Sequence, residues 1–274
     1  MFRVKKVLNH NTVIGIGMED NQEYLLIAKG IGFGRKVSER IEIPKDGTVY
    51  SLQEKTQRGL AFDLVKNIDP VILEITQQIL KEAENVFGKI DWAILFPMAD
   101  HIAFAVKRIE NQEQISNPLT EDIRALFHME YKTAQRICPV LKERLGVEID
   151  EHEIGYIALH IHSAIEDENV ALSMQIARTV RECIQLVEEE TGASIDVMSL
   201  SYNRLMNHVR YMAARAVKGE KLNLNMNDYM SVKFPEAFRL ASVVCGHLEK
   251  YLKKPLDEVE IGYLAMHIQR VSEE

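Results

Sequence analysis

The sequence is poor in cysteine and has no long apolar run, and both shortages exclude classes of protein. Only three of its 274 residues are cysteines, Cys138, Cys183 and Cys245, and none belongs to a CxxC pair. This argues against a disulfide framework or a cysteine-based zinc site and favours a reduced, cytoplasmic location. No apolar stretch is long enough to span a bilayer, and none follows the basic start of the chain, so we expect neither membrane insertion nor a secretory signal.

The patterns of common enzyme classes are also missing. There is no Walker-A loop, no Rossmann glycine fingerprint and no HExxH zinc motif. His160 and His162 resemble a pair of metal ligands, but residues two apart point to different faces of a helix. Gln269 also replaces the second histidine in the repeat described below. We therefore expect no enzyme, no metal site and no cofactor.

Charge is distributed unevenly along the chain, whose formal net charge is −8. Residues 1–57 contain nine Lys and Arg against seven Asp and Glu, whereas the remainder contains 24 against 34. A mildly basic head on an acidic body predicts two separate tasks, with any nucleic-acid binding confined to the head.

The head, residues 1–57, has the pattern of a small antiparallel β domain. Short runs rich in β-branched residues lie at 4–8, 12–17 and 24–27, separated by Asn, Asp and Gly turn signals. Runs at 40–43 and 48–52 add one or two strands. Such a small domain is marginally stable alone, so we expect the protein to form oligomers.

From residue 69 onward the pattern changes to helix, after a linker at 58–68. Asp69 followed by Pro70 predicts a helix start, because Asp caps the first turn and Pro is favoured at its first position. Asp150 and Asp257 are predicted caps of later helices. The further predicted helices lie at 91–109, 119–128, 130–144, 151–168, 172–191, 197–217, 233–252 and 256–272.

The helical body contains an internal repeat. Residues 150–161 and 257–268 are identical at nine of twelve positions, at an offset of 107 residues. The same offset maps His101 onto His208 and Arg108 onto Arg215. We therefore predict two homologous all-α modules, residues 69–170 and 171–274, with a boundary near 166–169.

Four of the nine histidines recur under the repeat, namely His101, His160, His208 and His267. The other five, His10, His128, His152, His162 and His247, have no such counterpart and are interpreted as ordinary side chains. Helical spacing places each recurring histidine on one face with an arginine or a glutamate. This set is either an ion pair joining two helices or a polar cluster able to hold a phosphoryl group, because neutral imidazole is a nucleophile near pH 7.

The segments 4–9, 29–36 and 100–108, together with the two repeated blocks, resemble the BglG/SacY/LicT-type transcriptional antiterminators over essentially the whole chain. The sequences at 30–34 and 159–164 are most similar to those of antiterminators of glucose-type phosphotransferase operons. The resemblance implies a co-antiterminator RNA-binding domain followed by two phosphotransferase-system (PTS) regulation domains. It also implies a homodimer that binds a hairpin in leader mRNA and prevents terminator formation. Phosphorylation by HPr and by a sugar-specific enzyme II permease is implied to control it.

The resemblance also implies site residues. The implied phosphorylation sites are His101, His160, His208 and His267, supported by Asp100, Arg108 and Arg215. The implied RNA contacts are Lys6, Asn9, Asn11, Lys29, Gly30 and Phe33, residue types that hydrogen-bond bases, stack on them or neutralise phosphate. His10 and the pair Ala28–Lys29 depart from the family pattern, which affects the expected RNA sequence preference.

Two rival functions remain open from the sequence. A PTS-regulated DNA-binding activator would use the same modules but needs a helix-turn-helix, whereas the head is predicted to be strands. A helical interaction protein would keep the paired histidines for packing alone.

Overall fold

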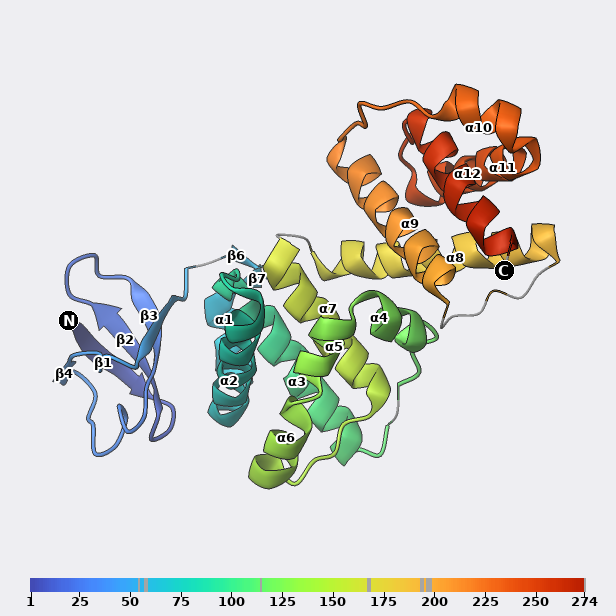
Figure 1. Ribbon diagram of the computed structural model, residues 1–274. Coiled ribbons are helices and arrows are strands. Elements are labelled where there is room, and N and C mark those ends of the chain that lie inside the picture. The colour runs from blue at the N-terminus through green and yellow to red at the C-terminus, as the bar shows by residue number, and fades with distance from the viewer. Residues whose placement is uncertain are drawn as a thin grey trace. The chain divides into compact units, whose positions relative to one another are not determined.

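The computed structural model describes residues 1–53, 55–56, 59–113, 115–166, 169–192, 195 and 199–273. It divides into two compact units, of which the first comprises Met1–Asn117 and Met129–Glu168 and the second Pro118–His128 and Asn169–Glu274. The predicted fold class is confirmed, because an antiparallel sheet is followed by helices and no strand occurs in the described part of 69–274. Figure 1 shows this change from strands to helices along the chain.

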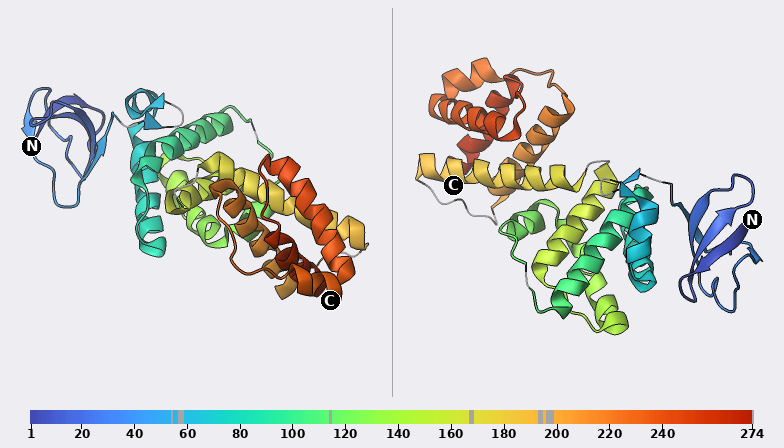
Figure 2. Two further views of the ribbon diagram at one scale, coloured as in Figure 1. Left: turned by 90° about the horizontal axis from the view of Figure 1, so that it is seen from above. Right: turned by 180° about the vertical axis from the view of Figure 1, so that it is seen from behind.

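The head is a five-stranded antiparallel sheet with the strand order β4-β1-β2-β3-β5. The strands are β1 (Phe2–Val7), β2 (Thr12–Gly17), β3 (Glu23–Ile27), β4 (Arg40–Ile41) and β5 (Thr48–Ser51). Turns at 9–11 and 18–22 join the first three strands, as predicted. In the views of Figures 1 and 2 these strands lie together without a helix among them. The described part of 1–57 thus contains no helix-turn-helix, which removes support for the DNA-binding alternative.

The core of the head consists of small aliphatic side chains from several strands and from the segment after β3. Its buried members are Val4, Val13, Leu26, Ala28, Ile31 and Ile41. Gly32 lies so close to the turn before β2 that an added Cβ would stand 2.2 Å from the carbonyl oxygen of Asn9. Only glycine allows this approach, which brings the segment 28–34 against the turn at 9–11.

Two short strands and six helices follow in the first unit, after the head. They are β6 (Lys55–Thr56), β7 (Gly59–Leu60), α1 (Ala61–Asn67), α2 (Pro70–Phe87), α3 (Leu95–Glu110), α5 (His128–Ala134), α6 (Ile137–Leu145) and α7 (Glu151–Glu166), with a 3-10 turn η1 (Trp92–Ile94) before α3. The second unit contains α4 (Thr120–Leu126), α8 (Val170–Thr191), α9 (Leu200–Lys218), α10 (Asn227–Lys233), α11 (Pro235–Leu252) and α12 (Val259–Ser272). Figure 2 shows the long α8 with the helices that pack on it.

Helix starts follow the predicted signals. The Asp69 carboxylate accepts a hydrogen bond from the Val71 amide, with Pro70 at the first helical position. Asp150 accepts from the Glu153 amide, and Asp257 accepts from Val259. Each side chain thereby satisfies one of the amides that a helix leaves without a partner.

The prediction of one helix over 130–144 is wrong, because α5 and α6 are separate. Pro139 has no amide hydrogen, and its ring would clash with the carbonyl of Gln135 in a continuous helix. The chain therefore turns at 135–136 and starts again at Ile137. The predicted helix ends at 168 and 197 lie outside the described residues.

Two helices occur where none was predicted. Helix α1 lies within the expected linker 58–68. Helix α10 buries only Met230 and is rich in polar residues, so its sequence has little helical pattern. Contacts with the start of α12 hold it instead: the Asn227 amide donates to the Glu258 carbonyl and accepts from the Gly262 amide. Packing here overrides a weak local preference.

Helix α4 packs on α8 in the second unit, although its sequence position is in the first repeat. The Arg181 guanidinium of α8 donates to the Pro118 carbonyl and to the Asp122 carboxylate, at 2.8 and 3.0 Å. Packing and sequence repeat therefore divide the chain differently at 118–128.

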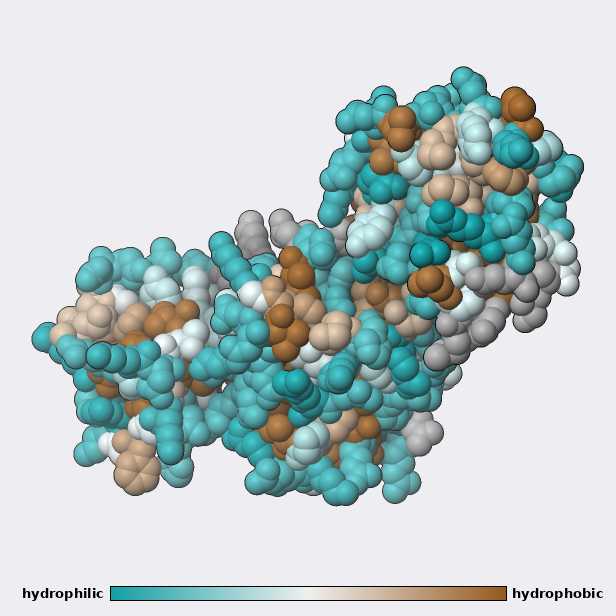
Figure 3. All heavy atoms as spheres, in the orientation of Figure 1, coloured by the Kyte–Doolittle hydropathy of each residue, from teal (hydrophilic) through white to brown (hydrophobic). Residues whose placement is uncertain are grey.

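Hydrophilic side chains cover most of the face shown in Figure 3, and hydrophobic side chains form small, separate patches on it. No helix in the described part of the chain combines the length and the apolar character that crossing a membrane requires.

Candidate functional site

The first module brings His101 of α3 and His160 of α7 together. Their ring centroids are 5.4 Å apart, with an angle of 43° between the planes. Tyr156, one helical turn before His160, lies with its ring centroid 5.4 Å from that of His101. The residues 153, 156 and 160 lie on one face of α7 because of their helical spacing, and that face points at α3.

A buried carboxylate lies beside this pair. Glu153, 2% exposed, places Oε2 3.0 Å from His101 Nε2 and accepts a hydrogen bond of 2.6 Å at Oε1 from Arg108. Burial opposes ionisation of Glu153, but the adjacent His101 imidazole and the hydrogen bond from Arg108 outweigh it and hold its pKa below the ordinary value. Asp100 directly precedes His101 on α3 and is half-buried.

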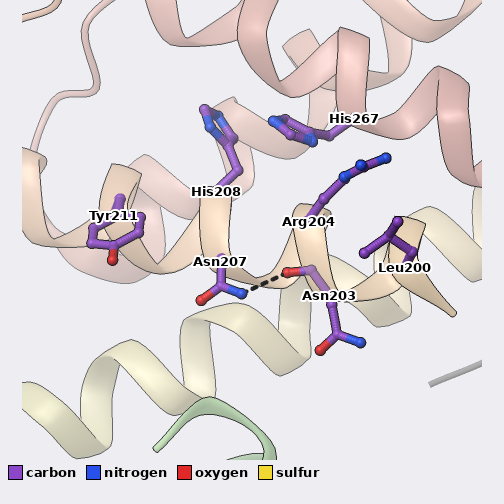
Figure 4. Close-up of a pocket in the computed structure, with 7 residues that line it drawn as sticks. All are labelled: Leu200, Asn203, Arg204, Asn207, His208, Tyr211 and His267. Atoms are coloured by element: carbon purple, nitrogen blue, oxygen red, sulfur yellow. Dashed lines mark hydrogen bonds between the residues drawn. The ribbon is translucent and has the colours of Figure 1, made fainter. Parts of the chain in front are cut away.

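The second module brings together the corresponding pair, His208 of α9 and His267 of α12. Their rings are stacked, with centroids 4.8 Å apart and an angle of 25°. They line an open pocket of about 410 Å³ whose other lining residues are Leu200, Asn203, Arg204, Asn207 and Tyr211. Figure 4 shows Arg204 extending from α9 beside the ring of His267.

The carboxylate of the second module is bound differently. Glu260 accepts two hydrogen bonds from Arg215, one at each oxygen, at 2.7 and 2.9 Å. Its Oε2 is 3.7 Å from His208 Nε2, which is too long for a hydrogen bond. The Arg215 guanidinium thus occupies both oxygens of the carboxylate.

Both imidazoles of the second module are held neutral. Burial, His267 and Arg215 lower the pKa of His208 to about 3. Burial, Arg270 and Arg204 lower the pKa of His267 to about 4. A neutral ring keeps a lone pair on one nitrogen at physiological pH, so both rings can act as nucleophiles.

Four of the six predicted RNA contacts lie together in the head, namely Asn9, Asn11, Gly30 and Phe33. The Asn11 amide oxygen accepts from the Gly30 amide, and Asn9 Oδ1 accepts from the Asn11 amide. Gly30 has φ +72°, a conformation that favours glycine. Phe33 is 70% exposed, and its ring lies 5.4 Å from that of His10. Lys29, next to Gly30, is exposed, and Lys6 is exposed on β1.

Glu74 of α2 contacts this part of the head. Its carboxylate accepts from Asn9 Nδ2 at 2.7 Å, from Asn11 Nδ2 at 3.2 Å and from the Thr12 hydroxyl at 3.4 Å. Arg144 donates to the same group at 2.9 Å. Within the first unit, then, the side-chain N–H groups of both asparagines are engaged by the helical module.

Sequence reasoning missed Glu74, Arg204 and Arg270. Glu74 has no local signal, because its partners lie more than 60 residues away. Arg204 and Arg270 had a signal: at the offset of 107 residues their counterparts are Pro97 and Ser163, so the two modules differ there. The sequence argument used only the positions at which the two copies of the repeat agree, so it overlooked positions at which they differ.

Comparisons with known proteins cover the head and both modules. The model of the CAT RNA binding domain matches residues 2–59, and the model of the PRD domain matches residues 74–164 and 181–271. Both bounds of the second PRD match lie 107 residues after those of the first, which is the offset of the repeat.

Relatives match nearly the full length. Protein GlcT of Staphylococcus haemolyticus (strain JCSC1435) is 31% identical over 97% of this chain and 95% of its own. The GlcA/glcB genes antiterminator of Staphylococcus carnosus (strain TM300) is 29% identical over 99% of this chain and 96% of its own. Among solved structures, the crystal structure of GlcT CAT-PRDI is 32% identical, has a TM-score of 0.52, and covers 60% of this chain and 98% of its own.

Proposed function

The chain belongs to the family of RNA-binding, PTS-regulated transcriptional antiterminators, in which a CAT RNA-binding domain precedes two PRD domains, and from that premise we propose how its parts act. The head, residues 1–57, binds a hairpin in a leader mRNA and prevents a terminator from forming. Residues 58–68 link it to two regulation modules, 69–170 and 171–274. The protein acts as a homodimer in the cytoplasm on transcripts of glucose-type phosphotransferase genes.

One observation carries the regulatory part of this proposal: the same histidine pair occurs twice, each time beside a buried glutamate–arginine ion pair. We assign phosphorylation to His101, His160, His208 and His267. Arg108 and Arg215 position the carboxylates next to the rings, and Asp100 sets the charge beside His101. A packing role alone would not require both imidazoles of the second module to face a solvent-open pocket.

The phosphoryl donors are HPr and a sugar-specific enzyme II permease. Permease-dependent phosphorylation of the first module inactivates, and HPr-dependent phosphorylation of the second module activates. Each phosphoryl group adds about −1.5 to −2 charges. In a two-fold symmetric dimer, identical charges on both subunits repel each other at a shared contact and separate the two RNA-binding heads.

The test is phosphoryl transfer from phospho-HPr to the purified chain, followed by peptide mapping. We expect phosphohistidine at His208 and His267, and at His101 and His160 when the phosphorylated permease is the donor, with a loss of each when that histidine is changed to Ala. In a reporter strain, His101→Ala with His160→Ala should give antitermination that persists without the sugar. His101→Asp should silence the reporter even with sugar. Full sugar dependence of the double Ala variant would refute the inhibitory role of the first module.

The RNA-binding role of the head has its own test. Phe33→Ala should weaken binding to the leader hairpin by about 1–3 kcal/mol, because an exposed aromatic ring stacks on a base. Asn9 and Asn11 cannot donate the same N–H groups to Glu74 and to RNA at once. Glu74→Ala should therefore strengthen RNA binding in electrophoretic shift assays. Unchanged affinity in both variants would contradict the assignment of this surface.

A further inference from the structure

Arg204 is not part of the glutamate–arginine ion pair that occurs in each module. It lies four residues before His208 on α9, so both side chains occupy one face of the helix. It lines the pocket with His208 and His267 and extends beside the ring of His267 in Figure 4. Its positive charge contributes to the low pKa of His267. In the described part of the chain, no ion pair involves Arg204, so its guanidinium is available to a ligand in the pocket.

The first module lacks this group. Five positions define the charge around each histidine pair: 97, 100, 108, 153 and 163 in the first module, and 204, 207, 215, 260 and 270 in the second. The first set contains one cation and two anions, whereas the second contains three cations and one anion. The formal charge is thus −1 around the first pair and +2 around the second.

We propose that Arg204 is a phosphoryl anchor, whose guanidinium binds the phosphoryl oxygens of a phosphohistidine at His267 and makes the second module the longer-lived phosphoryl store. The inference rests on the proposed phosphorylation of this module. A guanidinium fits this task because it is planar, always charged and donates two parallel hydrogen bonds to a phosphoryl group. Arg215 is engaged elsewhere, because its Nε and Nη2 both donate to the Glu260 carboxylate.

The chemistry shows why such a group prolongs the phosphorylated state. A ring nitrogen of neutral His267 attacks the phosphorus of a phosphohistidine donor, so that a new P–N bond forms and the P–N bond of the donor breaks. The electron pair of the broken bond returns to the donor imidazole, which takes up the proton that the other ring nitrogen of His267 releases. In hydrolysis, water attacks the same phosphorus, the P–N bond breaks, the imidazole recovers its electron pair and orthophosphate leaves. Protonation of the ring makes it a better leaving group. A cation beside the ring opposes that protonation and attracts the phosphoryl anion, so it slows hydrolysis.

The experiment measures the half-life of the phosphoryl group on His267 in the full chain. The chain is phosphorylated by phospho-HPr, the donor is removed, and the modified peptide is followed by mass spectrometry at neutral pH. Arg204→Gln should shorten the half-life on the order of tenfold, a factor that corresponds to about 1.4 kcal/mol. Arg204→Lys should restore most of it, because the charge is retained. Arg178→Gln, which removes an exposed arginine from α8, is the matched control and should leave the half-life unchanged.

The outcomes separate this inference from the proposed function. A phosphoryl group that forms on His267 but decays at the same rate in wild type and Arg204→Gln would overturn the anchor alone. Absence of any phosphoryl group on His267 in the wild type would overturn both. Pro97→Arg, in a chain phosphorylated by the permease, adds an independent arm, since an arginine at the equivalent place should lengthen the lifetime on His160. Circular dichroism of each variant checks that the helices remain folded.

Discussion

Each module places a tyrosine, a glutamate and an arginine around its pair of histidines, yet the glutamate carboxylate has different partners in the two modules. In the first module, Glu153 divides its oxygens between His101 and Arg108. In the second, both oxygens of Glu260 bind Arg215, and the nearest imidazole nitrogen is 3.7 Å away. A repeated sequence therefore does not guarantee repeated electrostatics.

The different partners of the two carboxylates give the two histidine pairs different electrostatic surroundings. In the first module the His101 imidazole lies 3.0 Å from the Glu153 carboxylate, so the charge of that carboxylate acts directly on the ring. In the second module the His208 ring makes no hydrogen bond to the carboxylate, and burial, reinforced by nearby arginines, lowers the pKa values of His208 and His267 to about 3 and 4. Electrostatics therefore favour phosphate more strongly in the second module than in the first.

The largest expected effect comes from removing, in each module, the arginine that binds the glutamate. Arg215→Met leaves both oxygens of buried Glu260 without their donors, next to an imidazole that resists protonation. We expect a loss of about 3–5 kcal/mol in the free energy of unfolding. Arg108→Met should cost less, about 1–3 kcal/mol, because the imidazole of His101 still lies 3.0 Å from the Glu153 carboxylate. Urea denaturation measures both, with exposed Arg178→Met as the control. Equal losses would show that the carboxylate contacts are equivalent.

Acid should destabilise the second module through its histidines. An unfolded histidine has a pKa near 6.5, whereas His208 and His267 have folded values of about 3 and 4. Between these limits the unfolded chain binds protons that the folded chain does not, so stability decreases as pH falls below about 6.5. The expected slope is roughly 1.4 kcal/mol per pH unit for each histidine. Urea midpoints between pH 7 and 4.5 test this, and His208→Gln with His267→Gln should flatten the profile. A profile that is unchanged by these substitutions would contradict the depressed pKa values.

Exchanging the residue before the first histidine should have the smallest effect. Asp100→Asn gives the first module the neutral amide of the second, and Asn207→Asp does the reverse. The phosphoryl lifetime should rise on the first module and fall on the second, by roughly two- to fivefold. These factors correspond to about 0.3–1 kcal/mol, which is the interaction energy expected between partly exposed charges. Half-lives from peptide mapping measure both, and changes of the same sign would contradict the electrostatic account.

Much of this arrangement could be predicted from the sequence because it follows from periodicity. Helical spacing placed Glu153 and His160 on one face, and the offset of the repeat implied the same for Glu260 and His267. The alternation of β-branched runs with Asn and Gly turns identified the strands of the head. Both patterns are local, and local patterns determine which face a residue occupies.

The parts that could not be predicted depend on distances between segments far apart in sequence. Whether an arginine engages one carboxylate oxygen or two depends on how closely its helix approaches. Glu74 meets Asn9 and Asn11 only because α2 lies against one end of the head. Helix α10 depends on Asn227 reaching the start of α12. The break at Pro139 was different, since its signal was present in the sequence and was not used.

The packing of α4 on α8 has a consequence for the order in which the chain matures on the ribosome. Residues 118–128 are translated roughly 63 to 73 residues before α8 is complete. At about 5–20 residues per second, α4 waits on the order of 3 to 15 s for the surface that it packs on. During that interval Asp122 lacks Arg181, and the apolar side of α4, which includes Ile123, is open to water or to a chaperone. A chain that ends between the two repeats would remain in this unfinished condition.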